Sequence, residues 1–399
     1  MQVQDDMSTE RLIIHAPNVH TGGGRVLLTE LLASLPPYAR GAAILDRRLQ
    51  TPLNLPREVV VRHVQPSLWA RLRAERYLAR ISDDNCRILC FGNLPPLARC
   101  RGRVSVFLHN RHLVSATDLS GFSLKARLRI LAERSWIRLF ASRVDEWIVQ
   151  TESMQLLLSR ILLSSDKIRI LPFVPVATVA GESSCIDGSV SASFHPVDFC
   201  YVASGEPHKN HRRLIEAWVL LAKQGQSPSL RITLDQREDR ELCDWIERQV
   251  RQFGLLVDNV GRIPPDEIAR VYRSCNCLIH PSWCESFGLP LVEARSYGLP
   301  IVAAELDYVR DVVVPHETFD PHSPRSIARA VRRQLGCRDA VQSLQDGKSF
   351  LQQLAVTEGR DVSSKGRHDL AKLLYTVDQS MPGEGEGDRD PAELVVSEE

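Results

Sequence analysis

The sequence of 399 residues contains no apolar run near the roughly 20 residues that a membrane-spanning helix requires. It also begins without a basic segment followed by an apolar stretch, so no leader peptide is predicted. Charge bias is absent too, since 50 Lys and Arg balance 49 Asp and Glu. The protein is therefore expected in the cytoplasm. Nucleic acid, which usually selects a strongly basic surface, is not an expected partner.

Metal-binding patterns are missing as well. None of the 10 cysteines forms a Cys-x-x-Cys pair, and most lie in apolar runs, so we expect reduced, buried thiols. Cys275 and Cys277 near His280 lie in a predicted strand, where alternation would put both sulfurs on one face without a partner pair. No metal site and no cofactor are predicted.

The chain is longer than one hydrophobic core usually supports, which favours two domains with a ligand-binding crevice between them. Strands alternate with helices in the N-terminal half, a pattern typical of a parallel sheet covered on both faces. The predicted strands cover residues 12–14, 42–45, 59–64, 88–91, 104–108 and 147–150. A glycine turn at residues 22–24 and a helix at residues 25–35 follow the first strand.

Residues 177–198 are rich in small side chains and predict a linker, which limits the N-terminal domain to residues 1–176. Residues 199–347 repeat the alternation and predict a second Rossmann-like domain. Its strands are 199–202, 230–234, 257–260, 277–280 and 300–303, and its helices are 210–223, 239–253, 266–274 and one containing Glu293. A helical segment at 348–378 is expected to pack back, and the acidic tail 379–399 to be disordered. The predicted fold class is α/β, with two doubly wound parallel-sheet domains facing across a crevice.

The most informative stretch runs from Cys277 to Ala294 and is typical of a strand, a loop and the start of a helix. Pro290 suits the first turn of that helix, where a missing N–H costs no intrahelical bond. The backbone N–H groups of Phe287, Gly288 and Leu289 are expected to point outward with the positive end of the helix dipole behind them. This helix start therefore predicts an anion site suited to a diphosphate.

Two carboxylates flank the predicted anion site. Glu285 precedes the helix together with Ser286 and can accept hydrogen bonds from sugar hydroxyls. Glu293 lies about one turn inside and can reach the ribose diol of a nucleotide. Glutamates at this spacing also occur by chance in charged proteins, but two carboxylates around one anion site predict a nucleotide-sugar site.

This stretch closely resembles the Glu-x7-Glu signature of retaining glycosyltransferase family 4, and the order of strands and helices agrees over nearly the whole chain before the tail. The resemblance implies the GT-B fold, a nucleotide-diphosphate sugar as donor, transfer with retention of configuration, and no metal. It assigns the donor to the C-terminal domain and the acceptor to the N-terminal domain. The diphosphate would leave on the face that the acceptor hydroxyl approaches, and would take the proton of that hydroxyl.

A second motif, residues 201–210, opens the C-terminal domain. In the family this loop supplies a lysine, and often an arginine five residues earlier, to neutralise the leaving diphosphate. Lys209 matches the lysine, whereas Ser204 stands where the arginine would be, and a protonated His208 could compensate. The loop resembles a Pro-His-Lys-Asn variant found in transferases that build bacterial surface polysaccharides.

Two motifs of the N-terminal half complete the expected site. A tight turn alone would explain Gly23 and Gly24, but in the family a glycine pair here lets the N-terminal domain approach the donor phosphates. His109 follows the buried strand 104–108 and would face the crevice by the strand-end rule. In the family a histidine or aspartate at this point contacts the donor sugar, and a core histidine is the alternative. The resemblance thus implies Glu285, Lys209 and His109 as the catalytic set.

The stretch 124–140 is basic and apolar, as is the stretch 69–80. Helices of this kind lie on anionic membranes, although arginine equally decorates ordinary solvated helices. The membrane interpretation implies peripheral binding at the inner face of the cytoplasmic membrane. The acceptor would then be a lipid-linked saccharide in O-antigen, capsule or exopolysaccharide biosynthesis.

Two alternatives share the predicted fold. One is a nucleotide-sugar 2-epimerase, which would convert the donor into its epimer and would release no nucleotide in the presence of an acceptor. The other is a catalytically degenerate subunit of a polysaccharide assembly complex, a possibility raised by Ser204. A dinucleotide-dependent dehydrogenase is disfavoured, because no acidic residue follows the glycine turn at the expected distance.

Overall fold

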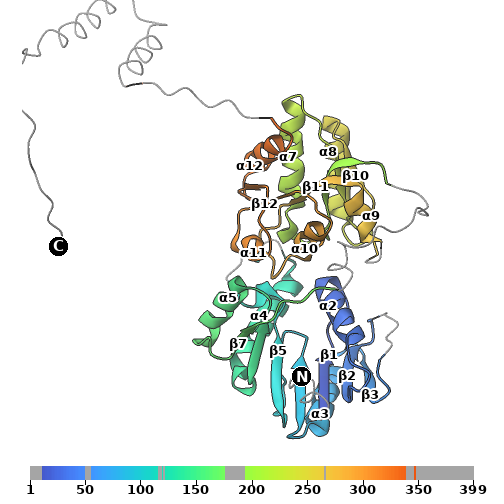
Figure 1. Cartoon of the computed structure of the whole chain (residues 1–399), viewed down its shortest axis with the longest axis vertical. Helices are drawn as coiled ribbons and strands as arrows, with labels where there is room; N and C mark the ends of the chain where they lie inside the picture. Colours follow the sequence, from blue (N-terminus) through green and yellow to red (C-terminus); the bar gives the residue numbers. More distant parts are fainter. Residues whose placement is uncertain are drawn as a thin grey trace, which may run out of the picture. The chain divides into compact units, whose positions relative to one another are not determined.

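The computed structural model describes residues 11–49, 55–115, 119, 122–175, 194–264, 267–337 and 346. It contains two parallel sheets, one in the N-terminal half (residues 11–175) and one in the C-terminal half (residues 194–337), as Figure 1 shows. The predicted fold class is confirmed. The core of the predicted linker, the segment 348–378 and the acidic tail lie outside the described residues, so the predictions made for them stay predictions.

The N-terminal sheet has seven strands in the order β3-β2-β1-β4-β5-β6-β7, and all neighbours are parallel. The strands are β1 (Arg11–Ala16), β2 (Gly41–Asp46), β3 (Val59–Val64), β4 (Cys86–Cys90), β5 (Arg103–Phe107), β6 (Glu146–Val149) and β7 (Ile168–Ile170). Six of them match predicted strands. The edge strand β7 was not predicted, because its three residues are too short to show a pattern.

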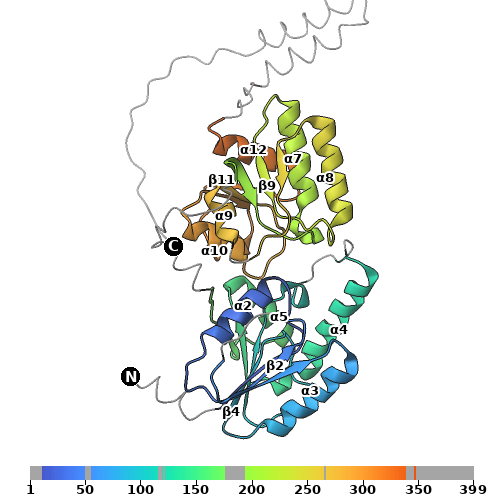
Figure 2. The ribbon, with the colours of Figure 1, turned by 90° about the vertical axis from the view of Figure 1, so that its right-hand side faces the viewer.

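Helices cover both faces of this sheet. They are α2 (Gly22–Ala33), α3 (Leu68–Ile81), α4 (Leu124–Phe140) and α5 (Glu152–Leu162), with short 3-10 turns η1 (Arg111–Leu113) and η2 (Ala141–Arg143). Neighbouring strand residues such as Ile13 and Ile14 point into different core clusters, as expected for a sheet buried on both sides. The buried residues of α2 join one cluster, and those of α3, α4 and α5 join the other. Figure 2 shows the ribbons of these four helices.

The predicted glycine turn is wrong in one respect. Gly22 to Gly24 form the first turn of α2, so the helix starts three residues earlier than predicted. Thr21 has the extended backbone of an N-cap residue, and the N–H of Arg25 reaches its carbonyl at 3.4 Å. Glycine is unfavourable in the middle of a helix. It is tolerated in the first turn, where it allows another group to come close to the backbone.

The C-terminal sheet has six parallel strands in the order β10-β9-β8-β11-β12-β13. The strands are β8 (Val197–Tyr201), β9 (Leu230–Ile232), β10 (Val257–Asn259), β11 (Cys275–His280), β12 (Ile301–Ala304) and β13 (Glu317–Phe319). The helices are α7 (His211–Lys223), α8 (Arg240–Phe253), α9 (Ile268–Arg273), α10 (Leu289–Ser296), α11 (Asp307–Arg310) and α12 (Pro324–Gln334), and η4 (Pro207–Lys209) precedes α7.

The two faces of the C-terminal sheet carry different helices. Buried residues of α7, α8 and α12 belong to one core cluster, and those of α9, α10 and α11 belong to the other. Cys275 and Cys277 fall into different clusters, so the prediction that both sulfurs share one face is wrong. Cys275 instead meets Cys200 of the neighbouring strand, with the two sulfurs 2.7 Å apart.

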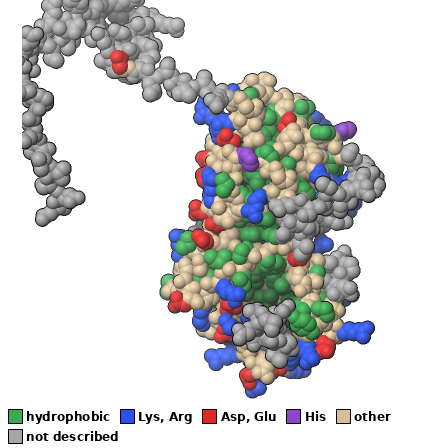
Figure 3. All heavy atoms as spheres, viewed as in Figure 1, with side chains coloured by type: hydrophobic (Ala, Val, Ile, Leu, Met, Phe, Trp, Pro, Cys, Tyr) green, Lys and Arg blue, Asp and Glu red, His purple; other side chains and the backbone are tan. Residues whose placement is uncertain are grey.

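The surface of the described residues mixes both signs of charge. On the face drawn in Figure 3, basic and acidic side chains are interspersed over both halves rather than gathered by sign. Among the described residues, no helix is long and apolar enough to cross a membrane.

Candidate active site

The centre of the candidate site is an ion pair between two loops of the C-terminal half. Lys209 Nζ donates to Glu285 Oε1 at 2.6 Å, and both side chains are largely buried. Lys209 ends η4, in the loop between β8 and α7, and Glu285 lies in the loop between β11 and α10. Parallel neighbouring strands bring their carboxyl ends to one sheet edge, so two motifs far apart in the sequence meet here.

Buried hydrogen bonds hold the two loops together. The Tyr201 hydroxyl donates to the carbonyl of Lys209 at 2.7 Å and lies 2.9 Å from the hydroxyl of Ser282. Asn210, which adopts a left-handed backbone with φ 65°, donates to the carbonyl of Pro281 at 3.0 Å. Because these bonds satisfy the backbone on both sides of the pair, the Lys209–Glu285 geometry is fixed before any ligand binds.

Lys209 decides the charge of Glu285. Burial raises the pKa of Glu285, but Lys209, His280 and His208 together outweigh it and lower that pKa to about 2. Burial also lowers the pKa of both His280 and His208 to about 4, so both imidazoles are neutral near pH 7. Lys209 is then the cation that keeps Glu285 ionised. The suggestion that a protonated His208 compensates for Ser204 is therefore wrong at neutral pH.

The start of α10 has the geometry that the sequence predicts. Gly288 is the N-cap with φ 80° and ψ 59°, a left-handed conformation that favours glycine, and Pro290 lies in the first turn. An added Cβ at Gly288 would lie 3.0 Å from Leu291 Cδ1. The first N–H groups of a helix have no intrahelical acceptor, so the N–H groups at this helix start, next to Glu285, are available to a ligand.

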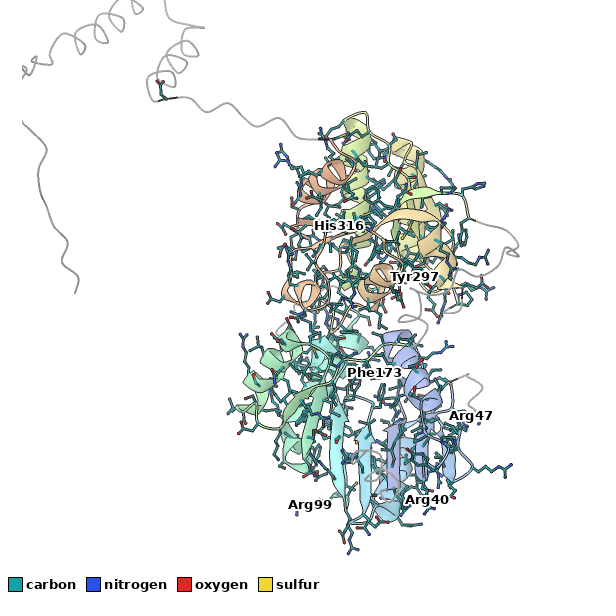
Figure 4. All side chains as sticks on the ribbon, in the orientation of Figure 1. Arg40, Arg47, Arg99, Phe173, Tyr297 and His316 are labelled. Atoms are coloured by element: carbon teal, nitrogen blue, oxygen red, sulfur yellow. The ribbon has the colours of Figure 1, made fainter. Side chains whose placement is uncertain are left out.

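Glu293 lies inside α10 and is held by a tyrosine from α9. The Tyr272 hydroxyl donates to Glu293 Oε2 at 2.7 Å, and Tyr297, labelled in Figure 4, stacks on Tyr272 with ring centroids 5.6 Å apart. Burial raises the pKa of Glu293, and the bond from Tyr272 opposes this shift. One carboxylate oxygen therefore has a fixed donor, while the other can accept from a ligand hydroxyl.

His109 comes from the N-terminal half, just after β5. Its backbone N–H donates to Asn93 Oδ1 at 2.7 Å, and Asn93 Nδ2 lies 3.3 Å from His109 Nε2. The amide orientation is fixed by the first bond, so Nε2 is the acceptor and the neutral ring carries its proton on Nδ1. His109 Nδ1 is buried and has no hydrogen-bond partner among the described residues. Burial lowers the pKa of His109 to about 4, which keeps the ring neutral.

The glycines of α2 lie against these groups. A Cβ at Gly24 would lie 2.6 Å from His109 Nε2, and a Cβ at Gly23 would lie 3.3 Å from Leu289 Cδ1. The backbone of α2 thus approaches His109 at Gly24 more closely than a side chain would permit, whereas at Gly23 only the flexible end of Leu289 is near. The predicted approach of these glycines to the donor phosphates stays a prediction.

Further contacts join the N-terminal half to the Glu285 loop. Ser286 Oγ donates to the His109 carbonyl at 2.8 Å, and Arg111 Nη1 donates to the Glu285 carbonyl at 3.3 Å. Ser204, in contrast, is exposed and bonds to Glu206 of its own loop. The structure thus brings Glu285, Lys209, Ser286 and His109 together but leaves Ser204 at the surface.

Sequence reasoning missed four residues of this site, namely Asn93, Arg111, Tyr272 and His280. Asn93 follows β4 closely, so the strand-end rule that selected His109 could have found it. Arg111 and His280 border predicted motifs but have no distinctive spacing. Tyr272 carries no local signal, because its role depends on how α9 packs beside α10.

The C-terminal half matches a known family. Residues 194–346 match the family model described as glycosyl transferases group 1. This part of the chain therefore forms a glycosyl transferases group 1 domain. The match includes every C-terminal residue of the candidate site.

Two curated relatives are similar to parts of the chain. O-antigen chain mannosyltransferase B of Escherichia coli is 31% identical over 115 residues, which cover 28% of this chain and 30% of the relative. D-inositol 3-phosphate glycosyltransferase of Corynebacterium glutamicum (strain R) is 39% identical over 144 residues, covering 34% of each. The matched stretches thus span about a third of the length of these relatives.

A solved structure extends the similarity to both sheets. Anabaena Alr3699/HepE, solved in complex with UDP and glucose, matches with a TM-score of 0.57 and 16% identity, covering 82% of this chain and 90% of that one. At this identity the likeness establishes the fold. Together with the two parallel sheets, it defines the chain as a GT-B protein.

Proposed function

We propose that this protein is a retaining glycosyltransferase that moves a hexose from a nucleotide-diphosphate sugar to a saccharide acceptor. The observation that carries the proposal is the buried Lys209–Glu285 pair at the start of α10, where a cation, a carboxylate and a backbone anion site meet. The position of His109, next to Gly24 and bonded through its carbonyl to Ser286, supports a role in orienting the donor sugar.

The proposed chemistry follows from these positions. Lys209 and the start of α10 stabilise the diphosphate as its bond to the anomeric carbon breaks. The acceptor hydroxyl attacks from the same face, and its proton passes to the leaving phosphate oxygen. Glu285 accepts hydrogen bonds from sugar hydroxyls, Glu293 binds the ribose diol, and neutral His109 can donate from Nδ1. Positioning and electrostatic stabilisation, rather than a protein base, account for the rate in this scheme.

Arg111 is proposed as the second cation. A diphosphate needs more positive charge than a lysine already paired with a carboxylate provides. Arg111 approaches the Glu285 loop from the N-terminal half, and its guanidinium carbon lies 5.9 Å from the ring centroid of Tyr308. We expect Arg111→Met to weaken nucleoside diphosphate binding about tenfold. Ser204→Arg in the same variant should restore it, whereas no rescue would place the missing charge elsewhere.

Charge neutralisation by Lys209, Arg111 and the helix start also predicts transfer without a metal. Dialysis against EDTA should leave the rate unchanged, and a rate that fell and returned with added Mg²⁺ or Mn²⁺ would contradict this part of the proposal.

The acceptor is proposed to be lipid-linked and to be met at an anionic membrane. The buried residues of α3 and α4, whose ribbons are drawn in Figure 2, belong to one core cluster of the N-terminal half. Both helices also expose apolar side chains. Leu124, Leu128, Leu131 and Leu139 project from one side of α4, and Leu68 and Trp69 start α3. Exposed basic residues flank them, including Lys125, Arg138 and Arg73. An apolar stripe flanked by cations fits the surface of an anionic bilayer.

Flotation with liposomes tests this surface. The protein should float with vesicles containing anionic lipid and remain at the bottom with neutral ones, and Leu68→Gln/Trp69→Gln should reduce flotation. Binding that ignores lipid charge would count against an inner-face location on the cytoplasmic membrane. The E. coli relative named for O-antigen chain mannosyl transfer supports a role in bacterial surface polysaccharide synthesis.

One assay separates the proposal from its two alternatives. The purified protein is incubated with a panel of nucleotide sugars, with and without membrane extract, and released nucleoside diphosphate is measured. A transferase releases it only when acceptor is present. An epimerase converts the donor without release, and a catalytically degenerate subunit does neither.

A further inference from the structure

A separate cavity lies at the N-terminal ends of α7 and α8. Its volume is about 900 Å³, and neither Lys209 nor Glu285 lines it. Cavities of about 300–1,000 Å³ are typical of small-molecule sites, so this one is at the upper end. The size favours a ligand larger than a single sugar ring.

The helices beside this cavity and the helix that carries Glu293 pack on opposite faces of the C-terminal sheet. The helices α7 and α8 pack in one core cluster, while α10, which carries Glu293, packs in the other. Gly205, Glu206 and Pro207 line the cavity from the loop that ends at Lys209. A ligand here would be separate from the nucleotide but only one loop away from the ion pair.

Two aromatic side chains line the cavity from different parts of the chain. Trp283 precedes Glu285 by two residues, and Phe122 precedes α4 in the N-terminal half. Both pack against His208, with ring centroids 6.3 Å away in each case. Their remaining surface is left for a ligand, and aromatic faces are suited to the apolar side of a sugar ring.

The charges around the cavity nearly cancel. The lining carries four carboxylates and three guanidiniums, of which Glu241 and Arg240 lie in the first turn of α8. Glu241 has no hydrogen bond or ion pair among the described residues, whereas Glu238 is paired with Arg262 at 3.3 Å. A balanced set of acceptors and donors disfavours an anion and suits a neutral polyhydroxyl ligand.

His211 supplies an independent sign of a ligand. His211 is one of the residues that line the cavity, is only 3% exposed, and has two buried ring nitrogens without a hydrogen-bond partner among the described residues. Burial, with a contribution from Lys209, lowers the pKa of His211 to about 3, so the ring is neutral. Buried polar groups are normally hydrogen-bonded. A neutral imidazole can donate to one hydroxyl and accept from another.

We propose that this cavity is a saccharide-binding subsite that holds sugar units of the acceptor chain beyond the reacting one. The inference rests on the proposed transferase function for its biological role. As a binding site for neutral oligosaccharides, it is testable without any catalysis.

Binding is measured by calorimetry with a ladder of free mannose oligosaccharides of increasing length, in the presence of a nucleoside diphosphate. Wild-type affinity should rise with length. Trp283→Ala and Phe122→Ala should each weaken binding of the longer members about tenfold, and Trp283→Phe should restore most of it. Affinity for the nucleoside diphosphate should change less than about twofold in these variants.

Matched controls come from exposed residues outside the cavity. Glu241→Gln should weaken oligosaccharide binding. Tyr38→Ala should leave this binding unchanged, as should Glu216→Gln, which is the matched control for Glu241→Gln. Equal saccharide affinity in wild type, Trp283→Ala and Glu241→Gln would overturn the subsite. So would a wild-type protein that binds no member of the ladder.

Turnover separates this inference from the proposed function. If the wild type transfers hexose and Trp283→Ala has an unchanged KM for every acceptor length, the subsite alone fails. If no donor is bound or consumed by the wild type, the transferase proposal fails, whereas length-dependent saccharide binding that Trp283→Ala abolishes would still support the subsite.

Discussion

Each half of the molecule buries a glutamate, and the two behave in opposite ways. The side chains of Glu285 and Glu75 are 12% and 11% exposed. Glu285 meets Lys209 at 2.6 Å, and its pKa is lowered to about 2. Glu75 of α3 has His15 at 3.5 Å, and burial raises the pKa of Glu75 to about 7 although the N–H of Leu97 bonds to it.

The difference lies in the partner rather than in burial. Burial also lowers the pKa of His15 to about 4, so a neutral ring faces Glu75 where an ammonium faces Glu285. The C-terminal half thus maintains a fixed charge pair at its strand ends, whereas the site residue His109 of the N-terminal half is a neutral ring. If the C-terminal half binds the diphosphate and the N-terminal half meets a neutral acceptor, as proposed, only the C-terminal half needs such a charge pair.

Removing a charge from the Lys209–Glu285 pair should have the largest effect. Lys209→Met removes the cation beside the leaving diphosphate, and we expect the transfer rate to fall about a thousandfold. The same change leaves Glu285 buried without a counter-charge and should lower the free energy of unfolding by about 3 kcal/mol. Steady-state kinetics and urea denaturation measure the two effects.

The double variant Lys209→Met/Glu285→Gln separates stability from catalysis. With both charges gone, the free energy of unfolding should recover, while the transfer rate should stay as low as in Lys209→Met. Glu285 has a folded pKa below its usual 4.5, so its stabilising contribution is complete above pH 4.5 and disappears as pH falls toward 2. The double variant should lack this acid-dependent loss. Full turnover in the double variant would show that Lys209 and Glu285 take no part in the reaction.

A substitution at Glu75, which faces the neutral His15, should change stability near neutral pH rather than in acid. Glu75 has a folded pKa of about 7, above its usual 4.5, so its favourable contribution is complete below pH 4.5 and disappears as pH rises to about 7. Glu75→Gln should therefore be more stable than wild type by roughly 3 kcal/mol at pH 8 and similar to it at pH 4. Urea denaturation at both pH values tests this. Glu58→Gln, at an exposed ion pair, is the control and should shift neither value appreciably.

A smaller effect is expected at Glu293. Glu293→Gln removes a charged acceptor for the ribose diol and should weaken nucleoside diphosphate binding about tenfold. The loss should shrink for a 2′-deoxynucleoside diphosphate, which offers one hydroxyl fewer. An equal loss for both ligands would show that Glu293 acts through Tyr272 and the packing of α10 instead.

An effect of similar size, on turnover rather than on binding, should come from Gly24. Gly24→Ala puts a Cβ 2.6 Å from His109 Nε2 and forces the ring away from Asn93, so turnover should fall about tenfold with little change in nucleotide affinity. Gly23→Ala, where the nearest atom is the flexible Leu289 Cδ1 at 3.3 Å, is the matched control. Similar turnover in both variants would argue against a role for the His109 position.

The sequence predicts the charged centre better than its surroundings. Lys209 and Glu285 lie in short motifs at strand ends, and the topology of a parallel sheet brings strand ends together, so both are accessible to local reasoning. The start of α10 is likewise marked by Gly288 and Pro290. The roles of these residues remain predictions, but their positions follow from local pattern.

The supporting residues depend on tertiary packing. Tyr272 lies 21 residues from Glu293, with nothing in its segment to mark the contact. Asn93, 16 residues from His109, could have been found only through its place at the end of β4. The glycine turn was misplaced because Gly22 to Gly24 look like loop residues, although they begin a helix. The cavity at α7 and α8 could not be predicted from the sequence either, because its walls come from five separate segments that only the fold brings together.

The most direct test of the account is calorimetric titration with a nucleoside diphosphate and with the same nucleoside lacking phosphates, for wild type and Lys209→Met. The wild type should bind the diphosphate at least about a hundredfold more tightly, because Lys209 and the start of α10 hold the phosphates. Lys209→Met should lose most of this preference. A wild type that binds both ligands equally, or a Lys209→Met protein that keeps the full preference, would contradict the assignment of the Lys209–Glu285 pair as the donor site.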